Sequence, residues 1–411
     1  MKSASVTRML GAGTRSSPFP TGATKIPCQA PTQRKRSSGP GICRQATYSI
    51  SNLLQSEAAI NQNIELLCGW LDKAADEQKE VDLAQLFTFA TNDNVGEFVF
   101  SRSFGFLEKG VDIGNTIENS LAHNAYVAII GFYGWVHTML IGNPLVTWLG
   151  ILPYGHIFDS AMRYAKEREA NPDARFDLIN HWLKALRENP DRMSIFDVHS
   201  AAMNNIAAGS DTVATGLQSF VYHMIRHRDA WQRCREELQA ASLATNDPII
   251  SFNDAQKLSY LQACITEALR IFSPTPMGLP RVVGKGGLTI GDQTFPKGTI
   301  LSVNNHVIHA SKEIWGQTAR EFRPERWLSA EGAKMQKYWI PFGAGYASCP
   351  GQNIARIQIS KISATLVRDY DIRQKDPSQD WTYKAYFTVA PRGWPVIIQK
   401  SSENDKVLKS P

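Results

Sequence analysis

The chain has 411 residues, 43% of them hydrophobic and 20% charged, which is ordinary for a globular protein that can hold one large core or two smaller ones. Its formal net charge of +6 comes from the first 56 residues, which hold eight Lys or Arg and no acid, so residues 57–411 carry a net charge of −2. This near-neutral body excludes the basic face of a nucleic-acid-binding protein. The six cysteines lack zinc-finger spacing and are too scattered for a disulfide framework.

Residues 1–45 are rich in Ser, Thr, Pro, Gly and Arg and show no apolar periodicity. Such a segment cannot bury enough apolar surface to offset the entropy of ordering, so we predict a disordered basic leader. Its acid-free composition also fits an organelle transit peptide, and a mis-assigned start of the reading frame is a third interpretation. No apolar core of a secretory signal follows the basic residues. We predict a leader over 1–45 and a single functional domain over 46–411.

From about residue 48 the apolar residues recur at helical spacing. The longest helix is predicted over residues 194–226. Others are predicted over 178–189, 255–272 and 352–368. Short β-branched runs at 281–283, 288–290, 299–301 and 395–398 predict small strands late in the chain, with turns at Gly291-Asp292 and Pro296-Lys297-Gly298. The fold class is therefore mainly α with small β-sheets.

Residues 119–158 contain no Asp, Glu, Lys or Arg. Gly and Pro interrupt this stretch repeatedly, whereas a membrane span needs about 20 continuous apolar residues. The pattern favours a buried or membrane-touching pair of helices over a span.

A Gly-rich loop late in the chain carries the most specific pattern. Phe342 stands seven residues before Cys349, and glycines such as Gly345 and Gly351 let the backbone turn sharply and approach a flat ligand. The helix predicted over 352–368 begins directly after the loop, so its N-terminus favours a thiolate at Cys349. A thiolate that donates to a haem iron promotes cleavage of the O–O bond. A buried Cys in a Gly-rich turn is the alternative, which the whole pattern argues against.

This loop resembles the haem-binding loop of the cytochrome P-450 superfamily, which reads Phe-x-x-Gly-x-Arg-x-Cys-x-Gly. The resemblance covers residues 48–411 and looks most like fungal class E members near pisatin demethylase. It implies the P-450 fold and a haem b cofactor with Cys349 as the axial metal ligand. It also implies that Phe342, Gly345 and Gly351 contact the cofactor.

Ala208, Gly209, Asp211 and Thr212 lie within the predicted helix 194–226 and resemble the oxygen-binding segment of the family. Ala208 and Gly209 leave room for the haem and O₂, and a Thr can take a hydrogen bond out of the helix ladder and open a groove. By resemblance, Asp211 and Thr212 are the catalytic pair that relays protons. The alternative is a small-residue helix-packing patch followed by a polar pair.

Glu267 and Arg270 stand three residues apart and share one helix face, which by itself is a common arrangement. The later segment Phe-Arg-Pro-Glu-Arg-Trp, residues 322–327, adds Arg326. The resemblance implies that these three residues form a buried Glu-Arg-Arg cluster with a structural role and no part in the chemistry. A buried carboxylate needs close cationic partners, which guanidinium groups supply.

The resemblance also implies residues around the cofactor. Arg281 is expected to pair with a haem propionate, the alternative being a surface Arg at a strand end. The pocket is expected to be lined by the uncharged stretch 125–155 and by six further residues: Asn205, Ile206, Ala207, Met277, Phe387 and Thr388. Such a lining suits a mostly apolar small molecule.

The chain departs from the family pattern in three places. Ala347 stands where the family has an Arg two residues before the ligand. The early helix with Trp-x-x-x-Arg is missing, since the single such spacing, Trp231 to Arg235, follows the oxygen-binding segment. Residues 1–45 resemble nothing in the family. We expect from this a truncated or mis-started version of a longer enzyme.

These observations predict an oxidoreductase: a haem-dependent monooxygenase that inserts one atom of O₂ into a mostly apolar small molecule, in fungal secondary metabolism or xenobiotic oxidation. Its electrons come from NADPH through a cytochrome reductase. Two alternatives stay open: a haem-thiolate isomerase or dehydratase, against which Asp211 and Thr212 argue, and a non-catalytic relative without haem. The resemblance implies the endoplasmic reticulum membrane surface, with residues 125–155 as a peripheral contact. A cytosolic location is the alternative, because this sequence shows no anchor.

Overall fold

The computed structural model describes residues 47–130, 133–139, 155–171, 176–241, 243, 247–345 and 348–401. The predicted leader lies outside this part of the chain, so its boundary at residue 45 stays a prediction. The helices, with the short 3-10 turns as η, are α3 (Ile50–Leu53), η2 (Leu54–Ser56), α4 (Glu57–Asp76), α5 (Leu83–Phe100), α6 (Phe106–Lys109), η3 (Ile113–Asn115), α7 (Thr116–Ile130), α8 (Gly134–Met139), α10 (Gly155–Ala170), α11 (Leu178–Glu188), α12 (Ile195–Gly209), α13 (Asp211–Arg226), α14 (Arg228–Ala240), α15 (Phe252–Lys257), α16 (Ser259–Ile271), α17 (Asn305–His309), α18 (Lys312–Trp315), η4 (Pro324–Leu328), α19 (Ala330–Met335), η5 (Gln336–Tyr338) and α20 (Gln352–Asp369).

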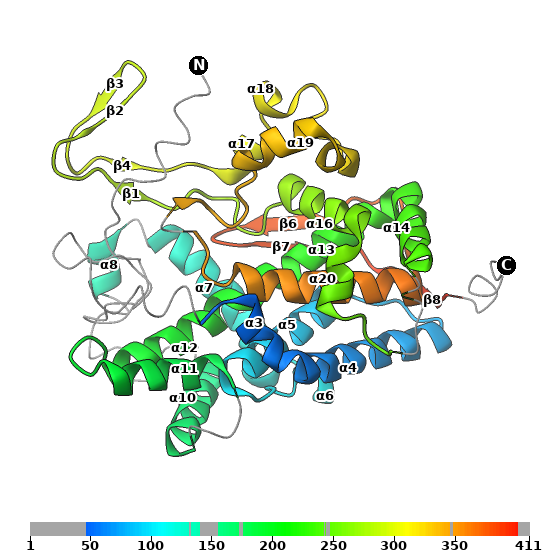
Figure 1. The fold of residues 1–411 in the computed structure, drawn as a ribbon, viewed down its shortest axis with the longest axis horizontal. Coiled ribbons are helices and arrows are strands. Elements are labelled where there is room, and N and C mark those ends of the chain that lie inside the picture. The colour runs from blue at the N-terminus through cyan, green and yellow to red at the C-terminus, as the bar shows by residue number, and fades with distance from the viewer. Residues whose placement is uncertain are drawn as a thin grey trace.

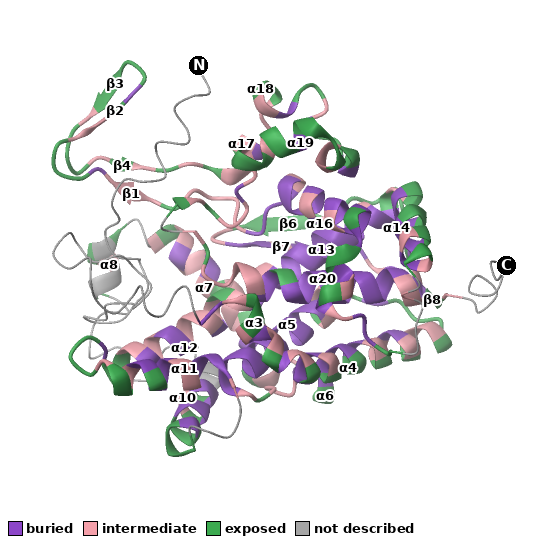
Figure 2. Cartoon of the chain, in the orientation of Figure 1, coloured by how far each residue is buried: buried purple, intermediate pink, exposed green. Residues whose placement is uncertain are grey.

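Helices α5, α13, α16 and α20 form the centre of the molecule, where Figure 2 shows most residues buried. In α5, 15 of 18 residues are buried, so this helix has no solvent face to distinguish by periodicity. One of its buried polar side chains is bonded across helices: Asn63 of α4 donates to Asn94 of α5 at 3.1 Å, and Asn94 donates to Gln358 of α20 at 3.1 Å. This amide chain fixes the register of three helices because an unpaired buried amide would be costly.

The strands form two-stranded antiparallel sheets. The pairs are β1 (Arg281–Val282) with β4 (Ile300–Leu301), β2 (Leu288–Ile290) with β3 (Gln293–Phe295), β5 (Tyr370–Gln374) with β8 (Val396–Lys400), and β6 (Thr382–Ala385) with β7 (Val389–Arg392). In Figure 1, β1 to β4 project from the helical body, whereas β6 and β7 lie against α13. The predicted class, mainly α with small β-sheets, is confirmed. Strands β3, β5, β6 and β7 were not predicted. All four residues of β6 are exposed, so it lacks an apolar alternation.

The helix predicted over residues 194–226 is two helices, α12 and α13, separated at Ser210. The Thr212 hydroxyl donates to the Ala208 carbonyl at 2.8 Å. A side chain that competes for a helix carbonyl weakens the backbone ladder there. The single-helix prediction is therefore wrong at one residue, within the segment predicted to bind oxygen.

The uncharged stretch falls on α7, α8 and the start of α10, and its residues 131–132 and 140–154 lie outside the described residues. None of the described helices combines the length and the apolar composition needed to cross a bilayer.

Candidate functional site

The loop before α20 wraps around Cys349. Gly343 and Gly345 have φ values of 69° and 71°, in the left-handed region that favours glycine. The Cys349 amide donates to the Phe342 carbonyl at 2.8 Å, which closes the loop on itself. A Cβ at Gly351 would lie 3.9 Å from the Cys349 Sγ, so the sulfur stands directly over the first turn of the helix. Cys349 is exposed and outside any disulfide, whereas Cys234 and Cys264 are buried.

This loop is anchored to α16 and α17. The Trp339 indole donates to the Thr266 carbonyl at 2.9 Å, and its ring lies edge-on to Phe342 with centroids 5.8 Å apart. The Ile340 amide donates to Nε2 of His309 at 3.0 Å. Burial, aided by nearby Arg270, lowers the pKa of His309 to about 3, so the ring is neutral and Nε2 can accept.

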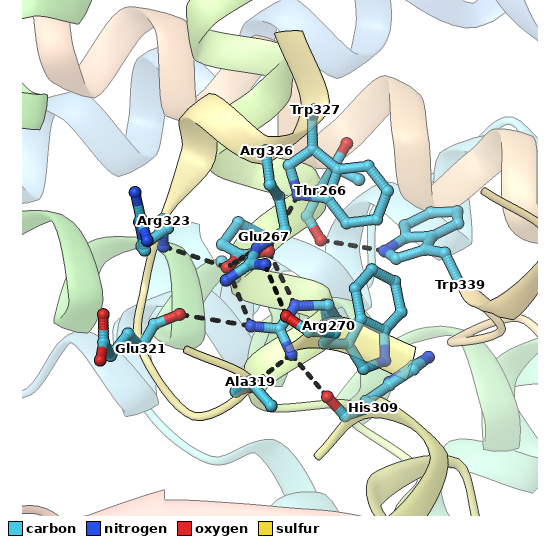
Figure 3. Close-up of polar contacts among 12 residues, drawn as sticks. Thr266, Glu267, Arg270, His309, Ala319, Glu321, Arg323, Arg326, Trp327 and Trp339 are labelled. Carbon is cyan, nitrogen blue, oxygen red and sulfur yellow. Dashed lines mark hydrogen bonds and ion pairs between the residues drawn. The ribbon is translucent and has the colours of Figure 1, made fainter. Parts of the chain in front are cut away.

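Glu267, Arg270 and Arg326 meet in one buried cluster, shown in Figure 3. Glu267 and Arg270 are fully buried. Arg270 donates to both carboxylate oxygens of Glu267, from Nε at 2.8 Å and from Nη2 at 2.9 Å. Arg326 donates from Nε to Oε1 at 2.8 Å, and the Trp327 indole donates to Oε2 at 2.9 Å. The Arg323 backbone amide also donates to Oε1, at 3.0 Å, so the carboxylate has two cationic partners and two neutral donors, as a buried charge requires.

The remaining donors of Arg270 extend the cluster toward the cysteine loop. Its Nη1 donates to the His309 carbonyl at 2.5 Å and to the Ala319 carbonyl at 2.7 Å. Because the His309 ring receives the Ile340 amide, a continuous series of contacts runs from Glu267 to the loop that carries Cys349.

Asp211 and Thr212 stand at the first turn of α13, just after the break. The Asp211 carboxyl oxygen Oδ2 accepts hydrogen bonds from the Ser120 hydroxyl and, at 3.1 Å, from the Asn124 amide, both on α7. Burial raises the pKa of Asp211, and these two donors offset the rise only in part. Ala208 is exposed and Gly209 is half-buried, so the last turn of α12, just before the break, is accessible to solvent.

The raised pKa of Asp211 predicts the effect of Asp211→Asn on stability. The unfolded chain has an ordinary carboxyl pKa near 4, so folding takes up a proton between that pH and the higher folded pKa. The wild type therefore loses stability as pH rises through this window, at up to about 1.4 kcal/mol per pH unit, and the Asn variant does not. Urea unfolding should show the variant gaining on the wild type as the pH rises above about 4, the ordinary carboxyl pKa; a difference independent of pH would contradict this.

Among the six residues named above as pocket lining, Ile206 and Thr388 are buried, at 3% and 7% exposure. The other four, Asn205, Ala207, Met277 and Phe387, are half-buried. The tip of the β6–β7 hairpin, which carries Phe387 and Thr388, is held against α13. The hydroxyl of Thr215 donates to the Val389 carbonyl at 2.7 Å, and the Val389 amide donates to the Pro274 carbonyl at 3.0 Å.

Thus α13, the hairpin tip and the segment leading to Met277 lie side by side. Arg281 opens strand β1, where its guanidinium donates to the Pro280 carbonyl at 3.3 Å. Its role at a haem propionate stays a prediction. Ala347 lies outside the described residues.

Tyr48 contacts both α12 and α20, and it was not among the predicted site residues. Its ring is buried, and its hydroxyl and the Asn205 amide exchange hydrogen bonds at 2.8 and 3.1 Å. The Asn353 amide, in the first turn of α20, donates to the Tyr48 carbonyl at 2.8 Å. Tyr48 therefore ties the helix that follows Cys349 to the end of α12. The Asn205 amide is engaged in these contacts and with the Ala201 carbonyl.

A family model for cytochrome P450 matches residues 32–392. The chain belongs to the cytochrome P450 family. This P450 is 31% identical over 342 residues to a cytochrome P450 monooxygenase of Aspergillus terreus, covering 80% of this chain and 69% of that protein. It is 29% identical over 372 residues to the cytochrome P450 monooxygenase mpaDE of Penicillium roqueforti, covering 87% of this chain and 43% of the relative.

Two further matches place this P450 in context. The cytochrome P450 monooxygenase ACRTS1 of Alternaria alternata is 28% identical, covering 82% of this chain and 92% of that one. The crystal structure of the cytochrome P450 CYP102L1 superposes with a TM-score of 0.73 at 21% identity, covering 86% of this chain and 76% of that chain. It confirms the predicted P450 fold. The closer likeness to pisatin demethylase stays a prediction.

The family implies a haem with a thiolate ligand, and the residues present fit that group. An exposed sulfur stands at the N-terminus of an 18-residue helix, where backbone amides stabilise negative charge. The other described cysteines, Cys68, Cys234 and Cys264, lie within helices. Thiolate is a ligand that haem iron accepts.

Proposed function

We propose that this P450 is a haem-dependent monooxygenase that inserts one oxygen atom from O₂ into a mostly apolar small molecule. The observation that carries the proposal is the exposed Cys349 sulfur, held at the N-terminus of α20 by a loop that closes on the Phe342 carbonyl. When bound, the haem supplies oxygen activation with electrons that derive from NADPH through a cytochrome reductase.

The chain's own residues would divide the remaining work. Cys349 would supply the thiolate ligand, and Phe342, Gly345 and Gly351 would let the loop approach the cofactor. Asp211 would hold and release a proton, and Thr212, whose hydroxyl bonds the Ala208 carbonyl at 2.8 Å, would guide it from the opened helix.

Two further assignments concern groups away from the reacting oxygen. Arg281 would pair with a propionate. Glu267, Arg270 and Arg326 would act structurally, because every partner of Glu267 described above belongs to the cluster or its neighbouring backbone. They would hold the loop by way of His309.

The substrate class follows from the lining. Ile206, Met277 and Phe387 would present apolar surface, and the uncharged stretch would add more. The relatives of Aspergillus terreus and Penicillium roqueforti carry the word monooxygenase in their names, which supports the reaction class. We place the substrate in fungal secondary metabolism or xenobiotic oxidation.

Membrane-surface contact is part of the proposal. The end of α7 and the start of α8 expose Ile129, Tyr133 and Trp135 at 55%, 55% and 69%. Aromatic side chains with a polar edge suit the headgroup region of a bilayer. We place this P450 at the endoplasmic reticulum surface, with these residues facing lipid.

The test is a reduced carbon-monoxide difference spectrum together with NADPH-dependent O₂ consumption in the presence of a reductase. A monooxygenase shows both the thiolate-type band and O₂ uptake. The band without O₂ uptake identifies a haem-thiolate isomerase or dehydratase. Purified chain that stays colourless when supplied with haem identifies a non-catalytic relative and overturns the proposal.

A further inference from the structure

The contact between α7 and Asp211 has a specific geometry. Ser120 and Asn124 are four residues apart, so they lie on one face of α7, and both donate to the same carboxyl oxygen, Oδ2 of Asp211. Asn124 is 8% exposed and is one of three buried residues in this 15-residue helix. A buried amide needs a hydrogen-bond partner, and the partner here is the carboxyl of another helix.

The partners of Asp211 are neutral. Within the described part of the chain, its carboxyl accepts from the Ser120 hydroxyl and the Asn124 amide and forms no ion pair. A cation would hold the carboxyl ionised, whereas two neutral donors on Oδ2 allow the other oxygen, Oδ1, to keep a proton.

The surrounding titratable groups do not change this conclusion. On α7 they are Glu118, His123 and Tyr126, and on α5, which packs against α13, they are Asp93 and Glu97. Those of α12, Asp197 and His199, lie in its first turns, at the end away from Ser210. Burial lowers the pKa of His123, so that ring is neutral. Asp93 accepts the amides of Gly105, Phe106 and Leu107 on the far side of α5.

We propose that Ser120 and Asn124 are positioning residues that hold the Asp211 carboxyl with its proton on Oδ1, ready for delivery toward Thr212. One proton leaves Oδ1 and is replaced from solvent water, while the two donors keep Oδ2 as acceptor throughout. The inference rests on the proposed function for its consequence in turnover, but the hold on the carboxyl is a property of the chain itself.

The first readout follows the carboxyl directly. The infrared C=O band of protonated Asp211, identified as the band that Asp211→Asn removes, is titrated with pH in the purified full chain. Each donor stabilises the ionised carboxyl, so Asn124→Leu and Ser120→Ala should both shift the pH at which the band disappears to higher values. Ser120→Thr keeps the hydroxyl and should titrate like the wild type. The matched control is Ser219→Ala, since this buried hydroxyl of α13 donates to the Ala268 carbonyl at 2.9 Å and not to Asp211. Unchanged titration in both donor variants overturns the inference.

The second readout is turnover with a reductase. Asn124→Leu should lower kcat roughly tenfold with little change in KM, and shift the pH profile of kcat in the same direction as the infrared titration. A fall in kcat without that shift indicates a merely structural role and overturns the inference. The two proposals fail separately: absence of the carbon-monoxide band sinks the monooxygenase, whereas the infrared titration still decides the role of Ser120 and Asn124.

Discussion

Replacing Cys349 by Ala should abolish the thiolate-type band in the reduced carbon-monoxide spectrum and reduce turnover to background. The reason is that no other described cysteine occupies an equivalent position. Cys349 is exposed at the N-terminus of α20, whereas Cys234 and Cys264 are buried between α14 and α16, 3.8 Å apart. Burial raises the pKa of Cys264 well above its ordinary value, so that group stays a thiol and cannot serve as a thiolate ligand.

The matched control for this variant is Cys68→Ala. Burial raises the pKa of Cys68 to about 12, and its backbone carbonyl and the Asp72 carboxylate both receive the Tyr370 hydroxyl. Removing this sulfur should leave the band in place, with a modest loss of stability from the small cavity. If the band survives in Cys349→Ala and disappears in Cys68→Ala, the ligand assignment is wrong.

Glu267→Gln should lower the free energy of unfolding by about 3–5 kcal/mol, the range found when one partner of a buried ion pair is removed. The variant removes the carboxylate that Arg270 and Arg326 share. Two buried positive charges then remain without a negative partner. The two unpaired guanidinium groups then account for most of the loss in stability, because they stay buried and cannot regain water without unfolding the cluster.

The same variant should also weaken the haem site. Arg270 holds the His309 carbonyl, and His309 holds the Ile340 amide at the entrance of the cysteine loop. Denaturant unfolding measures the stability, and the Soret absorbance per mole of protein measures cofactor retention. The control is Glu331→Gln, which breaks an exposed pair of the same spacing with Lys334 and should cost less than about 0.5 kcal/mol. Equal costs for the two variants would show that the buried cluster contributes no more than a surface pair.

The sequence carried the strongest local signals. The Gly-rich loop around Cys349 and the helix that follows it depend on residues that are close together in the sequence. Their geometry follows from backbone conformation and nearest-neighbour hydrogen bonds, which is why the family and the mainly α fold could be predicted. The single-helix prediction failed at Ser210 because apolar periodicity continues across a break that involves few residues.

Only the tertiary structure showed which groups meet across the chain. Ser120 and Asn124 contact a carboxyl 91 and 87 residues away, and Tyr48 contacts Asn205 and Asn353 over 157 and 305 residues. A polar pair at helical spacing in an uncharged stretch was a visible signal for the first contact, but it named no partner. Local sequence determines which conformation a segment prefers, whereas the partner of a buried polar group is set by the packing of helices that are distant in the chain. For that reason Cys349 could be chosen from the sequence as the candidate haem ligand, whereas the partners of Asp211 could not be predicted.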